Sequence, residues 1–181
     1  ETIFGKNNPS GKLPFTIPEK ESDLPEMNWD TDEIWYDYYH GYTLLNKMHR
    51  TPTYPFGCGL SYTEFELQNG RGWADSENFY GEITVTNIGK REGAEVIQMY
   101  IGTLNSVVER PEYTLQAFQK IFLKPGETQK VTLSCKISAL DYYDEETNKF
   151  VHENTDYVIY LGNSSDRNTL KKYKAIYRCY K

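Results

Sequence analysis

The feature that most constrains this chain is a strict alternation of residue type over residues 129–137. Apolar side chains occupy every second position and polar ones the positions between: Val131, Leu133, Cys135 and Ile137 against Lys130, Thr132, Ser134 and Lys136. Successive side chains of a strand point to opposite faces, so the pattern predicts a β-strand with one face in a core and the other in water.

Short stretches of similar texture recur along the chain from residue 62 onward. Strands are predicted at 62–68, 79–87, 94–101, 115–123, 129–137, 156–162 and 169–179. The 16 Tyr and 8 Phe suit such half-buried pleated surfaces. Segments such as "NIGKREG" and "KPGE" between the strands tolerate tight turns. The chain therefore reads as an all-β fold, an antiparallel β-sandwich in which sequential strands are often neighbours.

The segment 94–101, "AEVIQMYI", differs from the other predicted strands because it is apolar on both faces. Only Glu95 and Gln98 interrupt the apolar run. A strand of this kind is expected at the centre of a sheet, covered on both sides.

The N-terminal third carries no strand or helix period. Residues 1–20 hold closely spaced Pro and Gly, which predicts extended, irregular chain. Residues 21–53 are acidic and then rich in aromatics that would form a large exposed patch unless they lay against something bigger: Trp29, Trp35, Tyr36, Tyr38, Tyr39 and Tyr42. In "YPFGCGL" (54–60), Pro55 stiffens the backbone and Gly57 and Gly59 free it, which predicts a rigid corner into the sheet.

Composition excludes several classes of function. The net charge of −6 is spread without long single-sign runs, so neither nucleic acid nor an anionic membrane is expected as a partner. No apolar run reaches the roughly 18 residues of a spanning helix. The chain starts without Met and is interpreted as a fragment or a processed chain, so any targeting signal would lie outside it. The compartment is left open, with a secreted or periplasmic location favoured over a cytoplasmic one.

The three cysteines do not form a metal-ligand cluster or an even disulfide framework. Cys135 shares the apolar parity of its strand, which favours a small buried thiol, with pairing to Cys179 as the alternative. The histidines have no metal-ligand spacing, so neither a metal nor a cofactor is expected.

Five ordered motifs are specific enough to indicate a family: "GKNNPSGKLPFTIP" (5–18), "YPFGCGLSYTEF" (54–65), "ITVTNIGKREGAEVIQMYI" (83–101), "RPEYTLQAFQKIFLKPGETQKVTL" (110–133) and "LDYYDEETNKF" (140–150). In this order they resemble the C-terminal part of family 3 glycoside hydrolases, the β-glucosidases, β-xylosidases and related exo-acting enzymes. The resemblance implies that 1–18 is the C-terminal edge of an α/β sandwich domain, 19–61 an aromatic-rich linker, and 62–181 a fibronectin type III-like β-sandwich.

The resemblance also bears on catalysis. It implies an Asp nucleophile on a barrel and a Glu acid/base in the second domain, both upstream of these motifs, so no catalytic residue is expected in this chain. The local acidic cluster, Asp141, Asp144, Glu145 and Glu146, reads as a solvated loop between strands. Ser61 in "GLSYT" does not match a nucleophile elbow.

The expected function is that of a non-catalytic C-terminal portion that braces the catalytic barrel and α/β domains, in cis or on a separate chain. An oligosaccharide or aryl glycoside would be reached through those domains. The candidates for sugar contact at the rim are Trp35, Tyr38 and Tyr39, whose alternative role is to anchor the linker. A free-standing carbohydrate-binding or adhesion module, and an independent hydrolase with an unrecognised site, are the other hypotheses.

Overall fold

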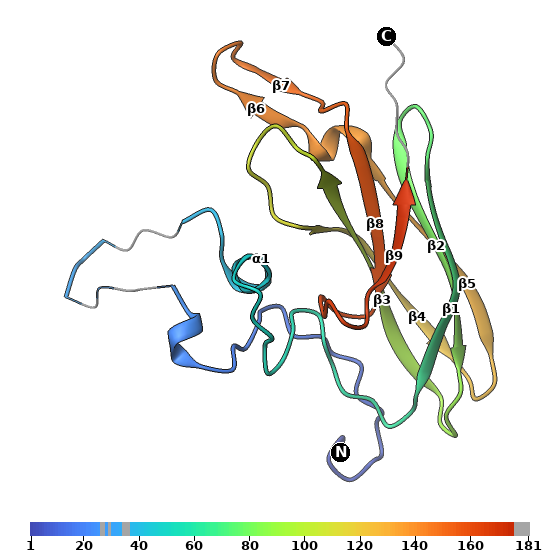
Figure 1. Ribbon diagram of the computed structural model, residues 1–181. Coiled ribbons are helices and arrows are strands. Elements are labelled where there is room, and N and C mark those ends of the chain that lie inside the picture. The colour runs from blue at the N-terminus through green and yellow to red at the C-terminus, as the bar shows by residue number, and fades with distance from the viewer. Residues whose placement is uncertain (26–27, 29, 34–36, 176–181) are drawn as a thin grey trace.

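The computed structural model describes residues 1–25, 28, 30–33 and 37–175, and it shows two antiparallel sheets packed face to face with an N-terminal segment along one side (Figure 1). One sheet has the order β1-β2-β5, and the other β4-β3-β8-β9. The strands are β1 (Phe65–Ala74), β2 (Asn78–Asn87), β3 (Gly93–Leu104), β4 (Thr114–Leu123), β5 (Thr128–Lys136), β8 (Asp156–Gly162) and β9 (Lys171–Ala175). The prediction of an all-β sandwich is confirmed.

The core lies between the two sheets, where alternate residues of each strand meet. In β5, Val131 and Leu133 are 2% and 5% exposed, whereas Lys130 and Thr132, which alternate with them along the strand, face water. Cys135 follows the predicted parity and packs half-buried against the same core as a free thiol. Its alternative partner, Cys179, lies outside the described residues.

Strand β3 is central, as predicted, and its middle is buried on both faces. Ile97, Met99 and Ile101 point into the core, whereas Gln98 and Tyr100 point away from it and are still buried. The N-terminal segment covers this outer face, because Tyr42 and Phe56 pack against Tyr100. β3 is therefore apolar on both faces because a second layer, which is not part of the sandwich, covers its outer face.

Three elements differ from the sequence prediction. Strand β1 runs on to Ala74 through a bulge after Gln68, where Asn69 adopts a φ of 51°. Residues that read as an acidic loop form the hairpin β6 (Tyr142–Asp144) and β7 (Lys149–Val151), which projects from one end of the sandwich (Figure 1). The segment 19–61, expected to be an irregular linker, contains the helix α1 (Gly41–Lys47).

Local bonds between Thr43 and His40 fix the start of helix α1. The hydroxyl of Thr43 accepts a hydrogen bond from the His40 amide (3.2 Å) and donates one to the His40 carbonyl (2.7 Å). Two short 3₁₀ turns, Glu21–Asp23 and Ile137–Leu140, complete the helical content of the described chain. None of these helices has the length or the apolar character that crossing a membrane requires.

Candidate functional site: the junction between linker and sandwich

Two extended N-terminal segments run antiparallel to each other across the outer face of the β4-β3-β8-β9 sheet. The Leu13 amide donates to the Cys58 carbonyl (2.9 Å), the Gly57 amide to the Leu13 carbonyl (2.8 Å), and Ile17 bridges Tyr54. Together with the residues of β3 beneath them they form what we call the junction (Figure 1). Backbone bonding thus ties two parts of the chain that lie some forty residues apart in sequence.

Gln98 of β3 explains why the corner requires glycine. Its side chain, only 3% exposed, donates to the carbonyls of Gly57 (3.1 Å) and Asn163 (2.8 Å) and accepts from the Tyr100 hydroxyl. Gly57 has a φ of 76°, and a Cβ atom there would lie 2.3 Å from Gln98 Oε1. Both the backbone angle and the close approach therefore disfavour a side chain at this position.

A buried ion pair also crosses the junction. Lys12 of the N-terminal segment pairs with Glu95 of β3, and their side chains are only 14% and 8% exposed. Glu95 also accepts hydrogen bonds from the Val96 amide (2.7 Å) and from Asn163 Nδ2 (3.0 Å). A buried charge is tolerated only when it is paired and hydrogen-bonded, so removing Lys12 would leave Glu95 without its counter-ion.

Aromatic rings fill the space between α1 and the sheet. Tyr42 packs on Phe56, Tyr100 and Tyr113 with ring centroids 5.2, 5.9 and 6.2 Å away. Burial raises the pKa of Tyr113 to about 12 and also raises the pKa of Tyr42, whose hydroxyl accepts from the Leu115 amide (3.1 Å). Tyr42 and Phe56 thus fix the N-terminal segment to the sheet, and the hydroxyl of Tyr42 has a hydrogen-bond partner.

The three candidate sugar-contact residues lie in different situations. Tyr39 is 7% exposed and sits under Lys47, whose Nζ lies 3.8 Å from the ring centroid. Tyr38 is 59% exposed and borders a mainly apolar pocket of about 610 Å³ that Phe15 and Phe56 also line. Trp35, together with Trp29 and Tyr36, lies outside the described residues.

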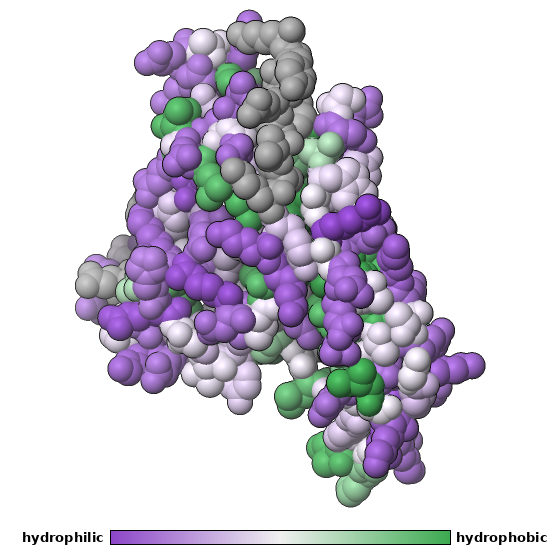
Figure 2. Space-filling view, turned by 45° about the vertical axis from the view of Figure 1, so that its right-hand side comes forward, coloured by the Kyte–Doolittle hydropathy of each residue, from purple (hydrophilic) through white to green (hydrophobic). Residues whose placement is uncertain are grey.

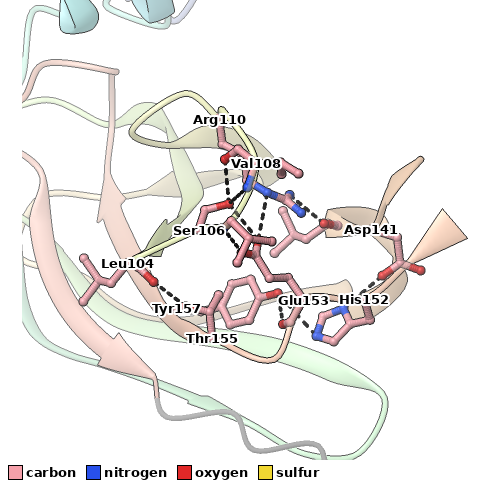
Figure 3. Close-up of polar contacts among 11 residues, drawn as sticks. Leu104, Ser106, Val108, Arg110, Asp141, His152, Glu153, Thr155 and Tyr157 are labelled. Carbon is pink, nitrogen blue, oxygen red and sulfur yellow. Dashed lines mark hydrogen bonds and ion pairs between the residues drawn. The ribbon is translucent and has the colours of Figure 1, made fainter. Parts of the chain in front are cut away.

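A second buried carboxylate holds the loop between β3 and β4, on which the linker rests. Glu153 pairs with Arg110 (3.2 Å) and accepts hydrogen bonds from the Ser106 hydroxyl (2.8 Å) and the Val107 amide. Figure 3 shows Ser106 and Arg110 converging on Glu153, and Arg110 also donates to the Leu140 carbonyl (2.7 Å). On its other side the same loop presents Glu109 to Lys47 of α1 (2.7 Å).

The remaining candidates for catalysis are occupied in other ways. The Ser61 hydroxyl donates to Asn8 Oδ1 (3.1 Å), and Asp144 of the hairpin accepts from Thr147. His152 pairs with Asp141 (2.9 Å) and faces the Tyr157 hydroxyl (Figure 3). Within the part of the chain that the structure describes, no three His, Cys, Asp or Glu side chains are grouped as metal ligands.

Sequence reasoning missed the polar residues of the junction. Lys12, Gln98 and Asn163 come from distant segments and share no motif spacing. Glu95 and Gln98 stood out as polar interruptions of an apolar strand, and this signal could have predicted buried partners from elsewhere.

Comparison with known proteins agrees with this architecture. The family model described as the glycosyl hydrolase family 3 C-terminal domain matches residues 1–62, and the fibronectin type III-like domain matches residues 95–165. The chain is 34% identical to thermostable β-glucosidase B of Acetivibrio thermocellus over 95% of its own length and 24% of that protein. It is 36% identical to a β-glucosidase of Kluyveromyces marxianus over 92% of its length and 20% of that protein.

Solved structures give the same result. The β-glucosidase of Kluyveromyces marxianus in complex with glucose superposes with a TM-score of 0.84 and 33% identity, over 99% of this chain and 23% of that one. β-Glucosidase 3B of Thermotoga neapolitana in complex with α-D-glucose gives 0.85 and 33%, over 95% and 25%. The chain thus spans about a quarter of the length of its relatives, and it belongs to glycosyl hydrolase family 3 as the C-terminal part of such an enzyme.

Proposed function

We propose that this chain is the non-catalytic bracing portion of an exo-acting β-glucosidase or β-xylosidase that hydrolyses O-glycosidic bonds. The observation that carries the proposal is the order of the two matched domains along a chain that spans only a quarter of β-glucosidases. Its relatives are named for an activity that, by the family resemblance, depends on carboxyl groups upstream of this part.

The chemistry of the described residues supports a bracing role. Glycoside hydrolysis needs two carboxyl groups in one pocket, about 5–10 Å apart. The buried carboxylates here are engaged elsewhere: Asp23 faces Arg50 (3.6 Å), Glu95 pairs with Lys12, and Glu153 pairs with Arg110. Each of these carboxylates is paired with a cation from another part of the chain, so their contacts hold segments together.

We further propose the division of the chain into an edge of the upstream α/β domain (1–18), a linker (19–61) and the sandwich (62–181). The regular strands begin only at Phe65, and helix α1 and the aromatic anchors fall within the proposed linker. The face seen in Figure 2 is mainly hydrophilic, with hydrophobic residues in small separate groups. Most of the exposed large hydrophobic side chains of the described chain lie in its first 62 residues. Such a surface suits a segment that is covered by a larger body.

Contact with an oligosaccharide or aryl glycoside at the active-site rim is a finer part of the proposal, with Trp35, Tyr38 and Tyr39 as its residues. Of the two residues that the structure describes, Tyr38 and Tyr39, Tyr38 is the more exposed, and it borders the pocket of about 610 Å³. The Tyr39 ring is covered by Lys47, so its contribution would be to position its neighbour.

Hydrolysis of chromogenic β-glucosides and β-xylosides tests the proposal. The chain alone should release no colour, and addition of the upstream portion of its reading frame, fused or separate, should produce turnover. Turnover by the chain alone, abolished by replacing one of its own carboxylates, would refute the bracing role. Saturable binding of cello- or xylo-oligosaccharides to the isolated chain, lost in Trp35→Ala, would instead favour a free-standing carbohydrate-binding module.

A further inference from the structure

An exposed aromatic face follows the edge strand β4. Phe118, Lys120 and Phe122 are alternate residues of this strand, so their side chains lie on one face. Phe118 pairs across the sheet with Gln98, which bonds to Gly57, so this is the face on which the N-terminal segment lies. Phe118 and Phe122 are nevertheless 67% and 58% exposed.

The N-terminal segment forms one wall of a groove beside these phenylalanines. Residues 5–8 and Ser10 line it together with Arg91, Lys120 and Phe122, and its volume is about 600 Å³. Lys120 Nζ donates to the Ser10 hydroxyl (2.8 Å), and Arg91 donates to the Gly5 carbonyl (3.0 Å). We call this groove, with the side chains of Phe118 and Phe122, the β4 face.

The β4 face is positively charged on a chain whose net charge is −6. Lys6, Arg91 and Lys120 line the groove, against Glu92 as its acidic residue. Among the ion pairs of the described residues, none includes these three cations. Arg91 and Lys120 donate to neutral oxygens, and Arg91 also lies over the Tyr62 ring (5.8 Å to the centroid). These contacts leave the positive charge available to carboxylates from outside.

A lysine on an edge strand can simply discourage strand pairing between molecules, and this would account for Lys120 alone. It does not account for the exposed phenyl rings on both sides of that lysine or for two further cations contributed by other segments. Aromatic side chains and Arg are enriched at protein–protein interfaces, so Phe118, Phe122 and Arg91 indicate such a surface. The two lysines would add electrostatic attraction for an acidic partner.

The relatives indicate what covers this face. The matched part amounts to 24% and 20% of two β-glucosidases, so most of each relative lies outside it. The groove wall formed by residues 5–10 belongs to the stretch matched by the family's C-terminal domain. An upstream body that continues from this stretch would lie beside the β4 face.

We propose that the β4 face is the docking surface for the preceding part of the same hydrolase, which presents apolar pockets flanked by Asp or Glu side chains. This inference rests on the proposed function and adds to it the contact surface and the chemistry of its partner.

The test measures binding of the 181-residue chain to the separately expressed upstream portion of its reading frame by isothermal titration calorimetry. Two variants alter the β4 face: Lys120→Glu, and Phe118→Ser combined with Phe122→Ser. The matched controls make the same changes on the hairpin strand β7, Lys149→Glu and Phe150→Ser, where Phe150 is 72% exposed. Circular dichroism and thermal melts first establish that all variants and the separately expressed upstream portion are folded.

The β4 variants should weaken binding by at least about tenfold, and the β7 variants by less than about twofold. Raising the sodium chloride concentration from about 0.05 to about 0.5 M should weaken the wild type more than Lys120→Glu. If the wild type binds and restores turnover but both sets of variants match it, the β4 face is wrong and the bracing role stands. If the wild type does not bind the upstream portion, both the docking surface and the bracing role are wrong. In that case, self-association of the wild-type chain that the β4 variants abolish would identify a second copy of the chain as the occupant of the β4 face.

Discussion

Replacing Gly57 by alanine should destabilise the chain more than a glycine substitution at the same backbone angle elsewhere. Gly57 has a φ of 76°, and the left-handed conformation costs a side chain about 1–2 kcal/mol. The new Cβ would also lie 2.3 Å from Gln98 Oε1. Gln98 would have to move and give up its hydrogen bonds to Gly57 and Asn163, each contributing about 0.5–1.5 kcal/mol.

The expected loss in the free energy of unfolding is therefore about 2–5 kcal/mol. Gly126→Ala is the matched control, because Gly126 has a φ of 75° but no atom within 4 Å of the added Cβ. This variant should lose only the backbone contribution, about 1–2 kcal/mol. Urea unfolding followed by circular dichroism measures both variants, provided that the m-values agree.

A double-mutant cycle isolates the contact itself. In a Gln98→Ala background, Gly57→Ala should no longer cause the steric clash and should cost less free energy of unfolding than in the wild type. The difference between the two costs is the coupling energy between the positions, and it should be about 1–3 kcal/mol. Equal losses for Gly57→Ala and Gly126→Ala would show that Gln98 does not form a fixed wall at the corner, and the account of the junction would then be wrong.

Three further substitutions probe the sandwich. Leu133→Ala should cost about 2–5 kcal/mol in urea unfolding because Leu133 is 5% exposed in the core, and a loss below about 1 kcal/mol would contradict its inward position. The amides of Glu77 and Asn78 lower the pKa of Asp75, so the contribution of Asp75 to stability is present above the unfolded value near 3.8 and is lost as the pH falls further. Asp75→Asn should therefore flatten the acid limb of a curve of stability against pH. An unchanged acid limb would refute this. Burial raises the pKa of Cys135 to about 11, so the contribution of the neutral thiol to stability is complete below about pH 9 and is lost as the pH rises to 11. Cys135→Ala should therefore lose less stability than the wild type over this alkaline range. An identical decline in the two proteins would contradict the burial of the thiol.

Local pattern was sufficient for most of the sandwich. The alternation of Val131 and Leu133 located β5, and the doubly apolar segment 94–101 located the central strand β3. Pattern was insufficient where one residue type permits two structures. Asn69 and Gly70 lie just past the predicted strand 62–68 but form a bulge within a longer β1, and the acidic run after Leu140, predicted as a loop, pairs as a hairpin.

The candidate rim residues show the same limit. Neighbouring tyrosines have no period that separates an exposed ring from a buried one. Tyr39 is covered because Glu109, from a loop far along the chain, holds Lys47 over it, whereas Tyr38 has no such cover and is 59% exposed. Trp35 remains a prediction, since it lies outside the described residues.

The sequence by itself determined most strands of the sandwich, the glycine corner and the membership of family 3, because periodicity, turn chemistry and ordered motifs are properties of residues close together in the chain. Only the tertiary structure decided that Lys12 pairs with Glu95, that Gln98 lies under Gly57 and that the N-terminal segment covers the outer face of β3. These choices depend on which distant groups leave water together, since a buried charge or amide is stable only beside a partner that local sequence does not specify.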